Sequence, residues 1–353
     1  MSSRRTWTRI SAGCKSNSLA PSKRCNAPSP GSRRPASGWT PSSAVLEPDT
    51  PNPLLEPYVP DGFEAFWQAL WESARDAPLS YSRAPAQARD LPHHQIETIV
   101  FQGVSGMELH GWIAIPRELQ AEAPAFLWIP AYGRWSHLPD PYSTREGFVS
   151  LSFNVHGLPA FHEEAYRPER GYFADGIESP DTWVMKRIIQ DVFLAVRILA
   201  DLPETDGHRL CAAGLSQGGG MALWAGAWCP LVQCVVADMP FLSAMRSVFS
   251  KPIYRYPLKE VVDFSQRSRV PMERILHTIS YFDTVNQATR CRVPTQVSCG
   301  LKDPAVRPET ARAVYDHLAT TQKRFVEYPG GHDWDPDMLE NNREWMNLNL
   351  SLP

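Results

Sequence analysis

Short apolar segments alternate with amphipathic helical patterns along most of this chain, and this alternation restricts the fold more than any other feature. AFLWIP (125–130) and FVSLSFNV (148–155) are typical of buried strands, and a long amphipathic helix follows the candidate N-cap Asp181. A further strand, RLCAAG (209–214), precedes a helix over 219–228. Because strands that alternate with helices pair in parallel, the pattern predicts an α/β fold with a doubly wound, mostly parallel sheet.

The alternation is interrupted once. Residues 242–290 are mostly helical, polar and aromatic, and we expect them to form a helical insertion over the sheet edge. The segment before them, VQCVVADMP (232–240), is a predicted strand. After them, TQVSCG (295–300) and RFVEYPG (324–330) are predicted strands with a helix over 308–320 between them. The insertion is therefore expected directly after one strand of the sheet.

The first 55 residues differ in composition from the rest. They are rich in Ser, Pro and Arg and follow neither helical nor strand periodicity, so they cannot bury enough apolar surface to offset their conformational entropy. We predict a disordered tail over 1–55 and one α/β domain over 56–353. An organellar transit peptide is also Ser-rich and, like residues 1–46, without acidic residues, although the prolines oppose the amphipathic helix that such peptides form.

The distribution of charge argues against some partners. Residues 1–46 contain eight Arg or Lys and no acidic residue, and because the whole chain has a net charge of −3, the remainder carries −11. An acidic domain is a poor ligand for nucleic acid, so we expect no such partner. No apolar stretch follows the N-terminal charges, and none reaches the roughly 18 residues of a membrane span. We therefore predict a cytoplasmic protein with no secretory signal and no membrane segment.

One serine stands in a glycine-rich turn between a predicted strand and a predicted helix. Ser216 has Gly214 two residues before it and Gly218 two residues after it, the G-x-S-x-G pattern of a nucleophile on a sharp turn. Asp303 and His332 each follow a later predicted strand. Because the carboxyl ends of parallel strands lie at one edge of a sheet, the three side chains can meet there. The order Ser, Asp, His is that of the α/β-hydrolases, so we expect a catalytic triad in an α/β-hydrolase fold.

These three residue types suit one reaction. A serine hydroxyl is a weak nucleophile until an imidazole accepts its proton, and a carboxylate on the far ring nitrogen sets the tautomer and stabilises the imidazolium. Ser216 would attack an acyl carbon, His332 would transfer the proton and Asp303 would orient the imidazole. A turn in which small residues are merely tolerated would explain Ser216 but not the other two positions.

Five stretches of the chain together resemble one family. They are FEAFW (63–67), GLSQGGG (214–220), ADMPFL (237–242), SYFDTVN (280–286) and CGLKD (299–303). They resemble the acetyl xylan esterase and cephalosporin C deacetylase family, carbohydrate esterase family seven, from about residue 57 to the C-terminus. The resemblance implies a serine esterase that releases acetate from small acetylated sugars and from cephalosporin C. It also implies no cofactor, an intracellular location and a homo-oligomer, often a hexamer.

The resemblance also suggests how the site is completed. An oxyanion hole needs two backbone N–H groups directed at the developing negative oxygen, and one is expected from Gln217, which follows the nucleophile. The family's His-Gly-Tyr-Asn-Gly sequence is matched here by PAYG (130–133), so Tyr132 is the candidate for the other, or else an aromatic residue packed at a strand end. Pro240 and Phe241 are expected to line a small acyl pocket.

Other residues allow different interpretations. The family's Arg-Gly-Gln motif appears here as HGL (156–158), which leaves the natural alcohol and the oligomer contacts undetermined. His156 and His162 lie near two glutamates, but their spacing of six fits no helical pair of metal ligands, and we expect no metal. Asp238 ends a strand where some hydrolases carry their acid, yet the family match favours Asp303.

A peptidase or acyltransferase on the same scaffold is the alternative function, since a fold does not determine a reaction. A binding protein with an inactive pocket is disfavoured because all three triad positions are filled.

Overall fold

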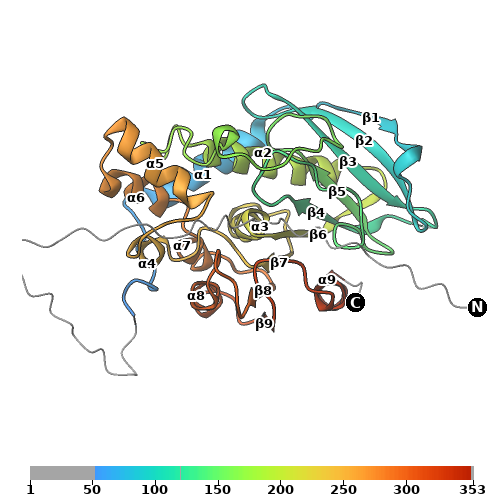
Figure 1. The fold of residues 1–353 in the computed structure, drawn as a ribbon. Helices are drawn as coiled ribbons and strands as arrows, with labels where there is room; N and C mark the ends of the chain where they lie inside the picture. The colour runs from blue at the N-terminus through green and yellow to red at the C-terminus, as the bar shows by residue number, and fades with distance from the viewer. Residues whose placement is uncertain (1–51, 120, 351–353) are drawn as a thin grey trace, which may run out of the picture. The chain divides into compact units, whose positions relative to one another are not determined.

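A nine-stranded sheet forms the centre of the structure, a computed structural model that describes residues 52–119 and 121–350 (Figure 1). The strands lie in the order β1-β2-β3-β5-β4-β6-β7-β8-β9. The first three pairs are antiparallel and the other five are parallel, so the predicted mostly parallel sheet is confirmed. In chain order the strands are Tyr81–Pro85, His94–Gln102, Glu108–Pro116, Ala123–Ile129, Val149–Phe153, Thr205–Leu215, Cys234–Asp238, Thr295–Gly300 and Lys323–Tyr328.

Side chains of the central strands alternate between two apolar cores, one on each face of the sheet. Leu127 of β4 packs in the larger core, whereas its neighbours Phe126 and Trp128 pack in the smaller core with Trp345 of α9. This alternation follows from the two-residue period of a strand, and it explains why the strands read as continuous apolar runs. The helices outside the insertion are α1 (Phe63–Asp76), α2 (Val184–Asp201), α3 (Gln217–Trp228), α8 (Pro308–Asp316) and α9 (Asp337–Leu350), with short 3-10 turns at Gln87–Arg89 and Pro168–Arg170.

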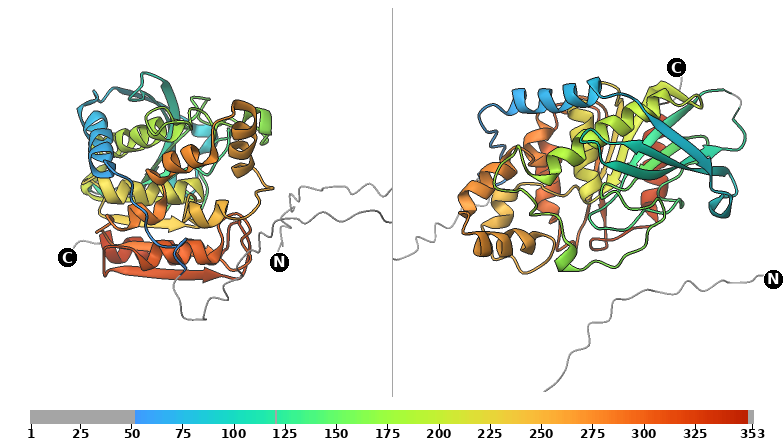
Figure 2. Two further views of the ribbon diagram at one scale, coloured as in Figure 1. Left: turned by 90° about the vertical axis from the view of Figure 1, so that its left-hand side faces the viewer. Right: turned by 90° about the horizontal axis from the view of Figure 1, so that it is seen from above.

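Helices α1, α2 and α3 contribute side chains to the larger core, and Figure 2 shows α1 and α2 side by side over the sheet. Helix α3 is apolar on all sides, and its residues from Gln217 to Gly226 are all buried. A helix with no polar face is stable only when it is surrounded by the protein, which places α3 against the centre of the sheet. Its first residue therefore lies at a buried, well-fixed point.

Helix α2 begins later than the sequence predicts. Its N-cap is Trp183, which makes no side-chain capping bond, and not Asp181. The backbone N–H groups of Thr182 and Trp183 both donate to the carbonyl of Ser179, so a turn occupies these residues before the helix starts. Asp181 instead pairs with Lys186, 3.1 Å away at the surface.

The predicted helical insertion after the strand at 234–238 is confirmed. It contains α4 (Met245–Phe249), α5 (Leu258–Ser268), α6 (Met272–Ser280) and α7 (Thr284–Ala288), drawn in orange tones in Figure 1. Asp283, in the SYFDTVN stretch, caps α7 and also accepts hydrogen bonds from the amides of Ala244 and Met245. Burial raises the pKa of Asp283 to about 6. This buried carboxylate thus joins the two ends of the insertion.

Two sequence predictions concern regions that the structure covers only in part. The tail predicted over 1–55 lies outside the described residues except for 52–55, so its disorder stays a prediction. Across the part of the chain that is described, no helix combines the length and the apolar character needed to cross a bilayer.

Candidate active site

Ser216 lies at the corner between β6, which ends at Leu215, and α3, which begins at Gln217. Its backbone has φ 59° and ψ −118°, a conformation that costs a non-glycine residue on the order of 1–3 kcal/mol. The corner is held by hydrogen bonds: the Ser216 N–H donates to the carbonyl of Asp238, and the Phe241 N–H donates to the carbonyl of Ser216, both at 2.9 Å. The strained turn is therefore fixed by the neighbouring strand end.

The two glycines of the motif leave room for close packing at the corner. Neither Gly214 nor Gly218 has a positive φ, and the strained conformation belongs to Ser216 itself. A Cβ atom on Gly218 would lie 1.9 Å from the carbonyl oxygen of Ile129, and one on Gly214 would lie 2.7 Å from the same oxygen. The glycines are required because α3 and β6 pack directly against the end of β4.

The structure brings Ser216, His332 and Asp303 into one hydrogen-bonded chain. The Nε2 atom of His332 lies 2.9 Å from Ser216 Oγ, and its Nδ1 atom lies 2.6 Å from Asp303 Oδ2. The other carboxylate oxygen of Asp303 accepts hydrogen bonds from the backbone amides of Ala305 and Val306, at 2.7 and 2.9 Å. The Asp303 side chain is fully buried, while 25% of the His332 side chain is exposed. The imidazole is thus anchored on one side and open to a ligand on the other.

Asp238, the alternative acid, lies in a separate buried cluster. Its carboxylate accepts hydrogen bonds from Ser298 Oγ at 2.5 Å and from Asn342 Nδ2 at 2.8 Å. Burial raises the pKa of Asp238. Of the two acids considered in the sequence, only Asp303 contacts His332, so the geometry favours Asp303 as the partner of the imidazole.

The backbone amides of Gln217 and Tyr132 are suited to receive a negatively charged oxygen. Gln217 is the first residue of α3, where amides have no partner within the helix, and Tyr132 lies in the loop after β4. Within the described ranges, neither amide donates a hydrogen bond to another residue. One of these donors follows Ser216 in the chain and the other belongs to a residue that lines the same cavity, which agrees with the expected oxyanion hole.

A cavity of about 340 Å³ opens over Ser216 and His332. Phe241 lines it, as expected, but Pro240 does not: Pro240 is buried behind the wall, and its carbonyl accepts a hydrogen bond from Ser243. Nearly half of the lining residues are aromatic, and these are Tyr132, Trp135, Tyr166, Phe241, Tyr256 and Trp334. The cavity is much larger than an acetyl group, so it has room for a cyclic alcohol beside the acyl group.

Comparison with known proteins assigns the family. The sequence profile of the acetyl xylan esterase (AXE1) family matches residues 55–347, most of the chain. This chain belongs to the acetyl xylan esterase family. It is 27% identical over 294 residues to acetyl esterase Axe7A of Xylanibacter ruminicola, an alignment that covers 80% of this chain and 65% of that protein. The chain thus spans slightly less than two thirds of the length of this curated relative.

Two solved structures of acetyl xylan esterases have the same fold. The enzyme from Paenibacillus sp. R4 superposes with a TM-score of 0.73 at 25% identity, covering 84% of this chain and 98% of that one. The enzyme from Thermoanaerobacterium sp. JW/SL YS485 gives a TM-score of 0.71 at 22% identity, covering 84% of this chain and 96% of that one. The prediction of an α/β-hydrolase fold is therefore confirmed.

A buried carboxylate connects the helical insertion of this acetyl xylan esterase family member to the loop that contains Tyr132. The sequence did not predict it. Glu260 of α5 accepts hydrogen bonds from the hydroxyls of Tyr132 and Tyr166, at 2.7 and 2.8 Å, and from the Phe173 amide at 2.9 Å. The Tyr132 hydroxyl in turn accepts the amide of Tyr172 at 2.8 Å. Burial and the nearby carboxylate raise the pKa of Tyr132. In the sequence Glu260 resembles any surface glutamate of an amphipathic helix, so no local signal could have identified it.

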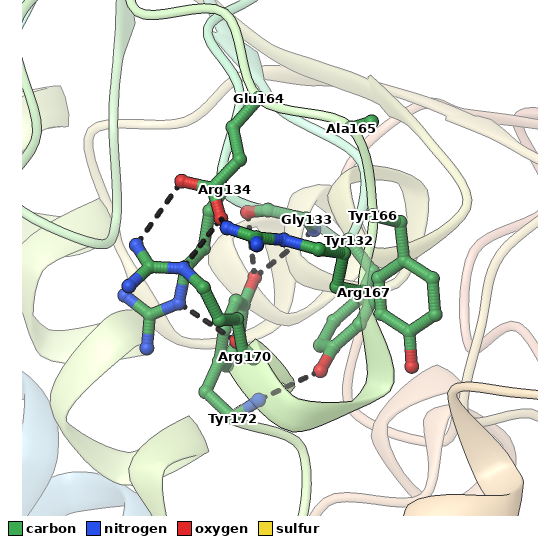
Figure 3. A pocket seen from close by; sticks show the side chains of 9 residues that line it. All are labelled: Tyr132, Gly133, Arg134, Glu164, Ala165, Tyr166, Arg167, Arg170 and Tyr172. Atoms are coloured by element: carbon green, nitrogen blue, oxygen red, sulfur yellow. Dashed lines mark hydrogen bonds and ion pairs between the residues drawn. The ribbon is translucent and has the colours of Figure 1, made fainter.

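A second loop holds the Tyr132 loop from the other side (Figure 3). Arg134 donates through Nε to the carbonyl of Arg170 at 2.8 Å, and Arg170 pairs with Glu164. The Tyr172 hydroxyl lies within hydrogen-bond distance of the Gly133 amide, at 3.4 Å. The space enclosed between the loops is about 10 Å³, room for one water molecule. Both loops therefore pack closely behind the candidate oxyanion donor.

His156 occupies the position at which the family resemblance places an arginine. Its Nε2 atom lies 3.5 Å from the carbonyl of Trp135, which lines the cavity, and its Nδ1 accepts the Leu158 amide at 3.2 Å. Burial lowers the pKa of His156 to about 4, so the ring is neutral near pH 7. His162 does not complete a metal site with it, and no other group of three metal-ligating side chains is found among residues 52–119 and 121–350.

Proposed function

We propose that this protein is a serine esterase that hydrolyses small acetyl esters, including acetylated sugars, through an acyl-enzyme on Ser216. The proposal rests on the hydrogen-bonded chain from Ser216 Oγ through both nitrogens of His332 to Asp303, at the base of an open cavity. Membership of the acetyl xylan esterase family supports acetate as the acyl group. The names of the relatives, an acetyl esterase and an acetyl xylan esterase, support it further.

In the proposed reaction, His332 Nε2 removes the proton from Ser216 Oγ as that oxygen attacks the acetyl carbonyl carbon. Asp303 accepts the Nδ1–H of His332, which fixes the tautomer and stabilises the imidazolium. The carbonyl oxygen becomes negatively charged and accepts hydrogen bonds from the backbone amides of Gln217 and Tyr132. His332 then gives its proton to the alcohol oxygen, the alcohol leaves, and a water molecule activated by the same imidazole hydrolyses the acetyl-enzyme.

The packing around Phe241 supports a short acyl group. The Phe241 N–H donates a hydrogen bond to the Ser216 carbonyl, the residue is 6% exposed, and its ring packs on Phe173 with ring centroids 5.4 Å apart. A wall that is fixed to the nucleophile and packed from behind cannot yield to a longer chain without displacing core side chains. The remaining aromatic cavity would then receive the alcohol part of the ester.

The proposal is tested with purified protein by acetate release from acetylated monosaccharides and from p-nitrophenyl acetate. Ser216→Ala and His332→Ala are each expected to lower kcat at least about 10³-fold, as for members of a triad that act together. Ser268→Ala, which alters an exposed serine of α5, is the matched control and should leave turnover unchanged. A fluorophosphonate probe should label the wild type but not Ser216→Ala. Comparable turnover by folded Ser216→Ala, checked by circular dichroism, would remove the mechanism.

The alternative reactions are separated in the same assays. A peptidase would cleave peptide p-nitroanilides, and an acyltransferase would move the acetyl group to an added alcohol in preference to water. We expect neither. The homo-oligomer and the cytoplasmic location that the sequence suggests stay predictions, and light scattering on the purified protein would measure the first.

A further inference from the structure

A second cavity opens from the active-site cavity on the side of the helical insertion. Its volume is about 410 Å³, and it shares Phe241, Tyr256, Pro257, Ala305 and His332 with the cavity over Ser216. The two are therefore parts of one larger binding space, and we call the second part the distal lobe. A group attached to the alcohol of a bound ester would extend from His332 into this lobe.

The distal lobe is positively charged. Arg255 and Arg307 line it, and no Asp or Glu of the described chain does so. This contrasts with the rest of the protein, since residues 47–353 carry a net charge of −11. A basic lining within an acidic domain attracts anions locally and distinguishes the lobe from its surroundings.

Neither arginine makes a side-chain hydrogen bond within the part of the chain that the structure describes. The guanidinium of Arg307 makes no hydrogen bond to any residue that the structure describes, and its closest carboxylate, Glu309, lies 3.7 Å from Nη1, too far for a hydrogen bond. Only 24% of the Arg307 side chain is exposed, so much of its charge is removed from water, and the half-exposed Glu309 is the one carboxylate of the described residues that offsets it. Arg255 is exposed and forms no ion pair or side-chain hydrogen bond within the described ranges.

We propose that the distal lobe binds a carboxylate on the alcohol part of the acetyl ester. A guanidinium presents its N–H donors in a planar fork that matches the two oxygens of a carboxylate, and such charge-assisted pairs are among the strongest hydrogen bonds in proteins. Arg307, half-buried next to the loop that carries Asp303, is the main anchor, and Arg255 closes the site from the insertion. The substrate class is therefore an acidic acetylated alcohol, such as an acetylated uronic acid.

This inference rests on the proposed function but has its own test. Two acetate esters with matched leaving groups are compared, 3-(4-acetoxyphenyl)propanoate and its amide, because two methylene groups insulate the phenol from the charge. For the wild type, kcat/KM should be about tenfold higher for the acid, mainly through KM, and the preference should decline as salt is added. A wild type that prefers the amide, or shows no preference at low salt, overturns the inference.

Variants locate the effect. Arg307→Met should lower the acid-to-amide ratio of kcat/KM about tenfold and Arg255→Met by a smaller factor, because Arg255 is exposed to water. Arg312→Met, on α8 but outside the lobe, changes the net charge equally and should keep the wild-type ratio. An equal loss in Arg312→Met would mean that only the overall charge matters, which contradicts the site.

Inhibition of the wild type provides a measurement that needs no variant. The product 3-(4-hydroxyphenyl)propanoate should inhibit about tenfold more strongly than its amide. Equal inhibition by the two would contradict the lobe even if Arg307→Met failed to fold. Hydrolysis of both esters at equal kcat/KM would be consistent with the proposed esterase function but would contradict carboxylate binding in the distal lobe. Hydrolysis that survives in Ser216→Ala would instead remove the proposed function.

Discussion

Glu260→Ala tests whether the helical insertion positions the Tyr132 loop for catalysis. The substitution removes the acceptor of three hydrogen bonds. The Tyr166 hydroxyl is exposed enough to bond to water instead, and the Phe173 amide can still donate to the Tyr132 hydroxyl oxygen, 3.1 Å away. Only the Tyr132 hydroxyl proton is left without a partner in a buried place. A single unsatisfied buried donor costs about 1–3 kcal/mol, and we expect the free energy of unfolding to fall by that amount.

The effect on catalysis should exceed what this loss of stability implies. Removal of one oxyanion donor costs about 10²–10³ in kcat. Because Glu260→Ala displaces the Tyr132 amide without deleting it, we expect kcat for p-nitrophenyl acetate to fall about 10- to 100-fold. KM should change little, since Glu260 is not a lining residue of the active-site cavity. Glu260→Gln keeps one acceptor oxygen and should show a smaller loss.

The assay is steady-state hydrolysis at pH 7.5, together with urea unfolding of each variant. Glu273→Gln, an exposed glutamate on the neighbouring helix α6, is the matched control and should behave as the wild type. Tyr132→Phe removes the same hydrogen bond from the other side, so its effect and that of Glu260→Ala should not add. A folded Glu260→Ala with kcat within about threefold of the wild type would refute the reasoning, because the loop would then be held without the carboxylate.

Three further outcomes are expected. Asp303→Asn should lower kcat far more than Asp238→Asn in steady-state assays, because only Asp303 contacts His332, and the reverse ranking would assign the acid to the earlier strand. For p-nitrophenyl esters, kcat/KM should fall about tenfold or more from acetate to butyrate, with octanoate nearly inert, because the wall at Phe241 is packed from behind; an optimum at octanoate would exclude a deacetylase. The pKa of His156 is about 4 in the folded state and about 6.5 when unfolded, so the unfolded chain binds the extra proton between these values and stability falls as the pH drops through this window. His156→Gln should therefore lose less stability than the wild type between pH 7 and pH 4.5 in urea titrations, and equal losses would show that the ring is not buried as a neutral group.

Much of the fold follows from local sequence patterns. The apolar runs at 125–130 and 148–155 indicated strands because a parallel strand is buried on both faces, and that condition is visible in the residues themselves. The expected meeting of Ser216, Asp303 and His332 followed from the geometry of parallel sheets, in which carboxyl ends share one edge. The start of α2 was misplaced by two residues because the choice between a cap and a turn depends on which carbonyl the following amides reach.

The tertiary structure alone decided what depends on contacts between distant segments. Whether Asp303 or Asp238 faces His332 is a matter of side-chain direction at two strand ends that look alike in sequence. The role of Glu260 depends on loops about 90 and 130 residues away along the chain. The presence of Arg255 and Arg307 in the wall of one lobe depends on how the insertion lies against the loop after β8. A glutamate or an arginine has the same helix propensity whether it faces water or another segment, so its local sequence does not reveal its partner. Periodicity therefore determined the scaffold, whereas burial and long-range contacts determined the polar groups that make the site.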